Sequence, residues 1–253
     1  MITIKSAFAQ AKMREAGRVV ESTLKMLGEN IRPGITTMAL NDLADAYIRA
    51  QGAIPSFLDY NGYPKSICLS VNDQVVHGIP GYYRLKEGDI VSCDVGAILY
   101  AYHGDAARTF LVGAVDEEKQ KLVRVTRECF FEGLKFCKPG FAVSDISQAI
   151  QVHAESHGYG VVRELVGHGI GTSLHEEPEV PNFFSARGAK IRLKSGMVLA
   201  IEPMINMGTE RVETLADDWT VVTRDGKPSA HYENTVLITA GEPELLTGSE
   251  ERP

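Results

Sequence analysis

Hydrophobic residues recur at helical spacing in two segments near the start of the chain. The first covers residues 12–27 and is closed by the turn sequence Ile31-Arg-Pro-Gly34, because Pro-Gly favours a tight turn. In the second, apolar residues at i, i+3, i+4, i+7 and i+8 predict a helix with one buried face. These residues are Leu40, Leu43, Ala44, Tyr47 and Ile48, and Gly52 is suited to the helix end.

The same helical pattern returns 106 residues further along the chain. Pro139-Gly140 corresponds to Pro33-Gly34, and Gly158 corresponds to Gly52. The shifted stripe consists of Ile146, Ala149, Ile150, His153 and Ala154. Two matched stripes in the same order, each followed by a glycine, indicate a duplicated unit.

Two shorter matches extend the repeat into strand-forming sequence. They pair residues 85–94 with 193–202 and residues 76–80 with 174–178. The first match places Asp94 opposite Glu202, and the second places His77 opposite His175. The repeat therefore predicts that carboxylates and imidazoles from both halves meet at a shared centre.

Each half has the pattern of two helices followed by several strands, without the strand–helix alternation of a parallel sheet. This order predicts an α+β fold with a central antiparallel sheet, helices on one face and two halves related by a pseudo-two-fold axis. The halves cover about residues 12–113 and 118–239. Since no linker-like Pro/Gly/Ser run separates them, we expect a single domain spanning residues 1–253.

Residues 92–110 are apolar and aromatic enough for a β-hairpin, yet they include Asp94 and Asp105. Aspartate is depleted in strands because its short side chain bonds turn backbone. A turn at Leu99-Tyr100 would make the two aspartates direct cross-strand partners, with Cβ atoms roughly 5 Å apart. Two ionised carboxylates at that distance repel, so a proton or a cation would have to lie between them. Two solvated aspartates at strand ends are the alternative.

Composition narrows the class of protein. The 253 residues are 44% hydrophobic and 23% charged, as in ordinary globular proteins. The net charge of -7 argues against a specific nucleic-acid partner. We expect no signal peptide and no membrane span, since no apolar run approaches roughly 18 residues. The four cysteines lack C-x-x-C spacing, so we expect reduced thiols in a cytoplasmic protein.

Three further residues could carry chemistry, each with a plain structural alternative. Glu202 lies in an apolar run, where a lone ionised carboxylate is costly to bury unless it stands at the wet end of a strand. Glu233 precedes a β-branched strand, and a surface position is its alternative. His168 lies between glycines, which permit close approach of backbone to a ligand. A structural histidine in a glycine-rich loop is the alternative there.

Together, two Asp, two Glu and one His would concentrate too much negative charge in one apolar centre without about two divalent cations. Carboxylate-bridged metal pairs activate water. An oxygen-rich shell with one imidazole suits Mn or Fe(II) better than the sulfur-rich shell of structural zinc, while Co and Zn would also bind.

Four motifs carry a resemblance to a known family. They are H-G-D-A-A-R-T-F at 103–110, G-H-G-I-G at 167–171, I-E-P-M at 201–204 and Y-E-N-T at 232–235. In combination they resemble the bacterial, type I methionine aminopeptidases over about residues 12–239. The duplicated pita-bread fold of that family agrees with the repeat.

The resemblance implies five ligands for a dinuclear metal centre: Asp94, Asp105, His168, Glu202 and Glu233. Asp105 and Glu233 would bridge the two metals. His168 and Glu202 would belong mainly to one ion, and Asp94 to the other. Glu202 would also act as base toward the bridging water.

The resemblance also assigns the two paired histidines. His77 would contact the substrate near its amino end and assist proton transfer to the leaving amine, and His175 would stabilise the developing oxyanion. The methionine pocket would be lined by Tyr60, Tyr63, Cys68 and Trp219. The remaining histidines keep structural or solvated roles: His103, His153, His157 and His231.

The implied activity is hydrolysis of the initiator methionine from nascent chains whose second residue is small. The attacking group would be a hydroxide that bridges two divalent metals. The partners would be nascent polypeptide N-termini, and we expect a cytoplasmic monomer without membrane association. Docking on ribosomes and the identity of the metal in the cell stay open.

Four residues depart from the family pattern without removing a ligand: Gly96, Leu174, His231 and Asn234. They bear on metal preference and rate. The nearest alternative activity is that of a prolidase or aminopeptidase P, which share the fold but usually carry a long extra N-terminal domain. A non-catalytic peptide-binding relative is the other alternative, and such relatives have lost metal ligands.

Overall fold

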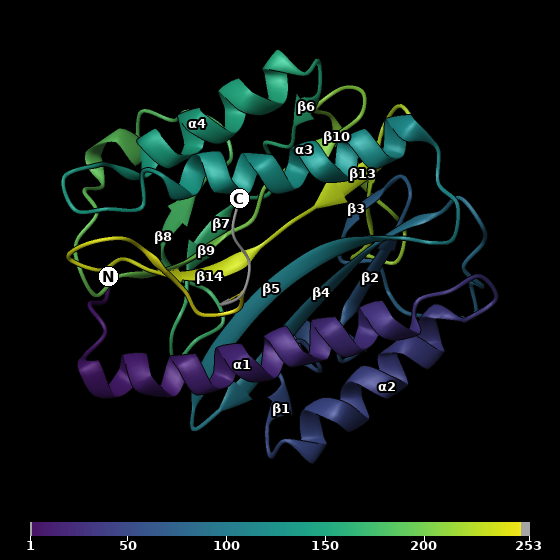
Figure 1. Ribbon diagram of the computed structural model, residues 1–253, viewed down its shortest axis with the longest axis horizontal. Coiled ribbons are helices and arrows are strands. Elements are labelled where there is room, and N and C mark those ends of the chain that lie inside the picture. The colour runs from purple at the N-terminus through teal and green to yellow at the C-terminus, as the bar shows by residue number, and fades with distance from the viewer. Residues whose placement is uncertain (1, 249–253) are drawn as a thin grey trace.

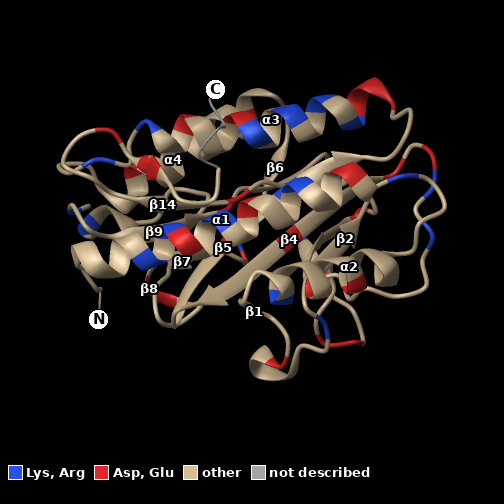
Figure 2. Cartoon of the chain, turned by 60° about the horizontal axis from the view of Figure 1, so that its bottom comes forward, with Lys and Arg blue, Asp and Glu red and all other residues tan. Residues whose placement is uncertain are grey.

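The structure is a computed structural model that describes residues 2–248. The predicted domain limits of 1 and 253 lie outside the described residues. The four long helices are α1 (Ala7–Asn30), α2 (Thr37–Ala50), α3 (Glu117–Leu134) and α4 (Val143–Ser156). They form two pairs, α1 with α2 and α3 with α4, and α1 lies along the two long strands β4 (Ile90–Leu99) and β5 (Tyr102–Leu111) (Figure 1 and Figure 2). Among the described helices, none has the length and apolar composition that a membrane crossing requires.

Most strands are short, and two 3-10 turns, Tyr60–Gly62 and Gly188–Lys190, lie between them. The strands of the first half are β1 (Ile54–Pro55), β2 (Cys68–Val71), β3 (Gln74–Val76), β4 (Ile90–Leu99) and β5 (Tyr102–Leu111). Those of the second half are β6 (Gly160–Val161), β7 (Gly167–Gly169), β8 (Glu176–Val180), β9 (Val198–Ile201), β10 (Met204–Asn206), β11 (Val212–Thr214), β12 (Val221–Thr223), β13 (Ser229–His231), β14 (Asn234–Leu237) and β15 (Glu244–Leu245).

Every strand pair within residues 2–248 is antiparallel, which confirms the predicted α+β fold. The strands divide among four hydrogen-bonded sheets rather than one. Their orders are β1-β4-β2 with β5 on β4, β13-β10-β6, β11-β12-β3 and β15-β14-β9-β7-β8. The strand β12 pairs with β3, so one sheet already combines both halves of the chain.

The predicted helices form, with local differences. α1 begins earlier than residue 12 because the Ser6 side chain accepts a hydrogen bond from the backbone N–H of Ala9 and caps the first turn. The buried stripe positions are Leu40, Ala44 and Ile48 in α2 and Ile146, Ile150 and Ala154 in α4. Leu43 is 40% exposed, so the apolar face of α2 is narrower than its sequence suggests.

Strand alternation separates the core from the opposite face of β4. Its odd-numbered residues Val91, Cys93 and Val95 belong to the hydrophobic core formed with α1 and α2. Successive side chains of a strand point to opposite faces, so Asp94 points away from the helices. In β9, Leu199 and Ile201 likewise pack into the core with α3 and α4.

The two halves are joined where β5 passes the residues between β13 and β14. The Glu233 N–H donates to the Ala107 carbonyl at 2.9 Å, and the Ala107 N–H donates back at 3.4 Å. Two residues along, the Thr235 hydroxyl accepts from the Asp105 N–H at 3.0 Å and donates to the Asp105 carbonyl at 2.8 Å. This seam, defined as the contact of residues 105–107 with 233–235, places Asp105 beside Glu233.

The hairpin of β4 and β5 turns one residue later than predicted. Leu99 pairs with Tyr102, and the turn residues Tyr100 and Ala101 have φ values of 52° and 65°. Two positive φ values give the turn a twist that matches the strands of a hairpin. Asp94 therefore pairs with Ala107, and the prediction that it pairs directly with Asp105 is wrong. The two aspartates are diagonal neighbours on the same face.

Replacing Ala101 by glycine should stabilise the protein. A left-handed backbone costs an L-residue about 1–2 kcal/mol, whereas glycine adopts it freely. After the greater chain entropy of glycine in the unfolded state is subtracted, we expect a gain of about 0.5–1 kcal/mol, or roughly 1–4 °C in Tm. The same substitution at Ala46, an exposed position inside α2, should lower Tm instead. Equal effects at the two positions in thermal unfolding would contradict the turn geometry.

Candidate metal centre

A cavity of about 260 Å³ contains all of the residues that the sequence predicted for the site. They are Tyr60, Tyr63, Cys68, His77, Asp94, Asp105, His168, His175, Glu202, Trp219 and Glu233. Phe57 and Asn61 also line the cavity, and the sequence analysis missed them. Both lie in the same loop as Tyr60 and Tyr63, so their closeness in sequence to these two predicted residues was the available signal.

Different elements bring the acidic side chains and His168 to the cavity. Asp94 comes from β4, Asp105 from β5 and His168 from β7. Glu202 directly follows β9, and Glu233 lies between β13 and β14. The side chains of Asp105 and Glu233 are buried, with exposed fractions of 4% and 2%. The alternative of solvated carboxylates at strand ends or on the surface is therefore wrong for these two residues.

His168 lies in a strand rather than in a glycine-rich loop. A Cβ atom on Gly167 would stand 2.4 Å from the Ala200 carbonyl oxygen, and one on Gly169 would stand 2.2 Å from that of Glu177. The two glycines therefore allow β7 to lie close between β8 and β9. The sequence suggested that the backbone of these glycines lies close to a ligand, but in the structure it lies close to the neighbouring strands.

The His168 ring has one nitrogen engaged and one facing the carboxylates. Its Nδ1–H donates to the Gly169 carbonyl at 2.8 Å, which leaves the Nε2 lone pair directed into the site. Nε2 lies 3.5 Å from Glu202 Oε1. Burial lowers the pKa of His168 to about 3, so the imidazole is neutral and can act as a ligand.

The clustered carboxyl groups hold protons unless a cation is present. Burial raises the pKa of Asp94 to about 7. Burial, followed by the charge of the neighbouring carboxylates, raises the pKa values of Asp105, Glu202 and Glu233 well above their ordinary range. A hydrogen bond with Asp94 raises the pKa of Asp105 further. At neutral pH the four groups therefore retain protons unless cations take the place of those protons.

Several buried ligand atoms have no hydrogen-bond partner within the described residues. They include Asp94 Oδ1, Asp105 Oδ1 and Glu233 Oε1. Ligand atoms of Asp105, His168 and Glu233 lie within 4.8 Å of one another, and so do those of Glu202, His231 and Glu233. Buried, unpartnered oxygens at such distances fit divalent cations, and Glu233 belongs to both groups.

His231 was not among the predicted site residues, although it is one of the four departures from the family pattern. It is buried, and its Nε2 lies 3.7 Å from Glu202 Oε2 and 3.9 Å from Glu233 Oε2. No hydrogen bond is formed by that nitrogen with any described residue. Of the structural and solvated roles expected for His231, burial excludes the solvated one. His231 stands two residues before Glu233, and residues two apart in an extended segment point to the same face. This spacing was the available signal.

Aromatic residues form the other wall of the cavity. The Trp219 and Tyr63 rings meet edge to face at 5.1 Å and 76°. The Tyr63 hydroxyl donates to the Gly78 carbonyl at 2.9 Å, which fixes that ring. Tyr60 Oη lies 2.7 Å from His175 Nδ1. His77 has a left-handed backbone with φ 59°, and burial lowers its pKa to about 4.

The remaining departures from the family pattern have structural explanations. A Cβ atom on Gly96 would lie 2.6 Å from the Phe57 ring, so glycine leaves space for Phe57 at the cavity. Asn234 Oδ1 accepts from Arg108 Nη2 at 2.8 Å and from the Thr247 hydroxyl at 3.1 Å, away from the cavity. Leu174 contributes an apolar surface to the cavity wall.

Comparison with known proteins agrees with this geometry. The profile of metallopeptidase family M24 matches residues 11–240. A methionine aminopeptidase of Clostridium perfringens is 53% identical over 98% of this chain and 99% of its own length. The crystal structure of methionine aminopeptidase from Thermotoga maritima has a TM-score of 0.95 and 44% identity, covering 98% of this chain and 99% of that one.

A more distant structural relative shares the fold alone. The prolidase from Pyrococcus furiosus has a TM-score of 0.79 at 22% identity, covering 98% of this chain and 66% of the prolidase. The profile match spans most of the chain, and the sequence relatives match over nearly their full lengths. The chain belongs to metallopeptidase family M24.

Proposed function

We propose that this chain is a methionine aminopeptidase, which hydrolyses the N-terminal methionine from polypeptides whose second residue is small. The observation that carries the proposal is that one cavity holds both sets of residues: the carboxylates and His168 on one side, and a wall of aromatic and apolar side chains on the other. The high identity to methionine aminopeptidases over the whole chain supports the choice of this reaction within the family.

The proposed metal ligands are Asp94, Asp105, His168, Glu202 and Glu233. These residues would hold two divalent cations, and the seam keeps Asp105 and Glu233 side by side for this role. Mn, Fe(II) and Co suit this oxygen-rich shell, and Zn would also bind. When bound, the cations would neutralise the carboxylates, lower the pKa of water and polarise the scissile carbonyl.

The apolar wall would receive the methionine side chain. Tyr60, Tyr63, Cys68 and Trp219 are the proposed lining residues, and Leu174 extends them. An unbranched thioether fits a narrow slot, and its sulfur makes favourable contacts with aromatic edges. His77 adjoins the Trp219 ring, with ring centroids 6.4 Å apart, and would contact the substrate near its amino end.

The chain's own acid and base groups account for the proton movements. Glu202 would take the proton of the attacking water, and His77 would assist its transfer to the leaving amine. His175 would donate a hydrogen bond from Nε2 to the developing oxyanion. The Tyr60 hydroxyl, donating to His175 Nδ1, would hold the tautomer that keeps hydrogen on Nε2.

We further propose a cytoplasmic, monomeric enzyme that acts on nascent chains. All four cysteines are buried, unpaired thiols, which supports a reducing compartment. Net negative charge does not favour specific nucleic-acid binding, so any transient contact with ribosomes would use a local surface.

A peptide assay tests the reaction. Protein purified anaerobically without added metal should contain about two divalent ions per chain and should hydrolyse Met-Ala-Ser but leave Xaa-Pro peptides intact. Asp105→Asn should lose bound metal and turnover together, because it removes a bridging charge. Protein that leaves Met-Ala-Ser intact even after Mn²⁺ or Co²⁺ is added, or cleavage confined to Xaa-Pro bonds, would reject the proposal.

His231 should strengthen metal binding without being essential for the fold. Its Nε2 lies 3.7 Å from Glu202 Oε2, so a small rotation would let an N–H donate to that carboxylate, and removing such a partner of a ligand typically weakens metal affinity about 10–100-fold. We expect that loss in His231→Ala by calorimetric titration with Mn²⁺. His231→Gln, which retains an N–H donor, should recover most of the affinity. Equal metal affinity in the alanine variant and the parent would exclude this positioning role.

Removing the metals should make stability depend on pH above neutrality. The raised carboxyl pKa values mean that the folded, metal-free chain holds protons that the unfolded chain has already released. That stabilisation is present at low pH and is lost as pH rises through about 7 and beyond. The buried histidines have lowered pKa values and are neutral in this range, so they do not oppose the trend.

Urea unfolding between pH 7 and 8.5 measures the effect. With chelator, unfolding free energy should fall by about 1 kcal/mol per pH unit for each carboxyl still protonated. With saturating Mn²⁺ the carboxylates are ionised in the folded protein, so the decline should be much smaller. A metal-free protein whose stability is flat or rising over this range would show that the carboxyl groups are not protonated.

A further inference from the structure

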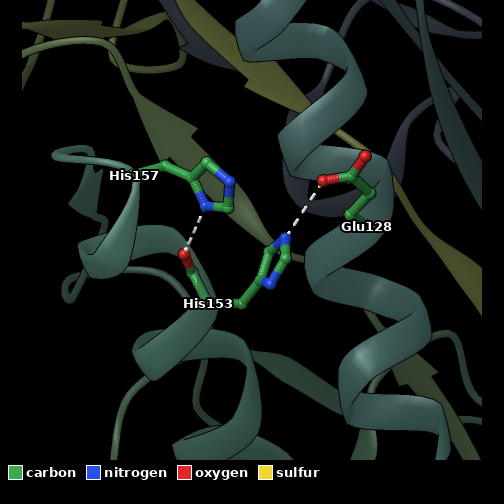
Figure 3. A group of neighbouring side chains, drawn as sticks. All are labelled: Glu128, His153 and His157. Carbon is green, nitrogen blue, oxygen red and sulfur yellow. Dashed lines mark hydrogen bonds and ion pairs between the residues drawn. The ribbon is translucent and has the colours of Figure 1, made fainter.

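A second cluster of metal-ligating side chains lies between α3 and α4, and none of its members lines the cavity described above. Glu128 projects from α3, His153 from α4, and His157 directly follows α4 (Figure 3). We propose that these three residues bind one divalent cation, preferably Zn²⁺, and that the bound ion links the two helices.

The ligand atoms are close enough for one cation. His153 Nε2 lies 3.1 Å from Glu128 Oε2, and one ligand atom from each of the three residues lies within 4.8 Å of the others. The two imidazole rings have centroids 4.7 Å apart. Zinc bonds to nitrogen and oxygen of about 2.0–2.2 Å place tetrahedral ligand atoms roughly 3–4 Å apart. Small side-chain rotations would therefore close the site around the ion.

Local hydrogen bonds prepare two of the ligands. His157 Nδ1–H donates to the His153 carbonyl at 2.9 Å, so the lone pair of His157 lies on Nε2, which faces the other two residues (Figure 3). Arg124 Nε lies 3.7 Å from Glu128 Oε1 and leaves Oε2 directed at His153. Histidines that bind metal usually donate their second N–H to a backbone carbonyl or a carboxylate, and carboxylates that bind metal are usually oriented by a neighbouring donor.

The arrangement of the three residues favours zinc. His153 lies in the last turn of α4 and His157 is the residue that ends the helix, so the two have the i, i+4 spacing that zinc-binding helices use. Two imidazole nitrogens with one carboxylate oxygen suit Zn²⁺ better than Mn²⁺ or Mg²⁺, which prefer oxygen-rich shells. The side chains of His153 and Glu128 are 23% and 39% exposed, so water can supply a fourth ligand. An ion that bridges α3 and α4 binds the folded chain better than the unfolded one, so it should raise Tm.

Zinc titration of the full-length protein tests the site. We expect the parent protein to bind one more Zn²⁺ than His153→Gln, measured by equilibrium dialysis and metal analysis. Micromolar Zn²⁺ should raise the Tm of the parent, and His157→Gln should weaken binding of this ion at least tenfold. Asp105→Asn should retain the additional ion although it loses metal at the cavity. Glu155→Gln, an exposed change on α4 outside the cluster, should behave like the parent.

Two readouts separate the ion from a structural ion pair. If Glu128 and His153 only pair with each other, parent and His153→Gln will bind equal amounts of Zn²⁺ with equal affinity, and the proposal is overturned. Circular dichroism and Tm, both measured in chelator, show whether His153→Gln folds normally. If it does not, His157→Gln takes its place in the comparison with the parent. Hydrolysis of Met-Ala-Ser by Mn²⁺-loaded His153→Gln and His157→Gln should be unchanged, which would show that these substitutions act on the second cluster and not on the cavity.

Discussion

The structure depends on one electrostatic constraint, which is that carboxylates from both halves of the chain are buried beside one another. The seam between residues 105–107 and 233–235 holds two of them, Asp105 and Glu233, by paired backbone hydrogen bonds. The Arg108 charge lowers the pKa of Glu233, but burial and the neighbouring carboxylates outweigh it, and the imidazoles of His168 and His231 lie within ion-pair distance of Glu202 or Glu233. Both imidazoles are neutral near pH 7, so protons or divalent cations must balance the cluster.

The surrounding fold makes this cluster possible because one face of each strand packs into the core and the other face carries residues of the site. The core-facing residues of β4 and β9 pack against the helix pairs, and their neighbours in sequence point to the site. The apolar packing on one face is therefore mechanically coupled to the position of ligand atoms on the other. Close strand packing at Gly167 and Gly169 serves the same end, since it sets the place of His168 between β8 and β9.

The same logic distinguishes the cavity from the cluster between α3 and α4. At the cavity, burial makes an uncompensated charge costly, so the carboxyl groups ionise only where cations replace their protons. At the helix pair, the ligands are partly exposed and already satisfied by Arg124 and by backbone. A cation there adds a link between helices to a structure that is complete without it.

An error of one residue in the hairpin turn left the predicted site intact. Moving the turn from Leu99-Tyr100 to Tyr100-Ala101 shifts each cross-strand partner by two positions. Side chains alternate with a period of two, so Asp94 and Asp105 remain on one face although they are not direct partners. The turn itself was hard to place because Tyr100-Ala101 lacks the Asn-Gly or Asp-Gly signal of such turns.

The sequence by itself determined the residue types, the helical stripes, the repeat and the family resemblance, because these are carried by order and spacing along the chain. It did not determine that His231 lies against Glu202 and Glu233, that Phe57 needs the space at Gly96, or that Gly167 and Gly169 pack on strands. Each of these depends on distances between segments far apart in sequence. Only the tertiary structure decides them, because the seam and the helix packing set how closely those segments approach.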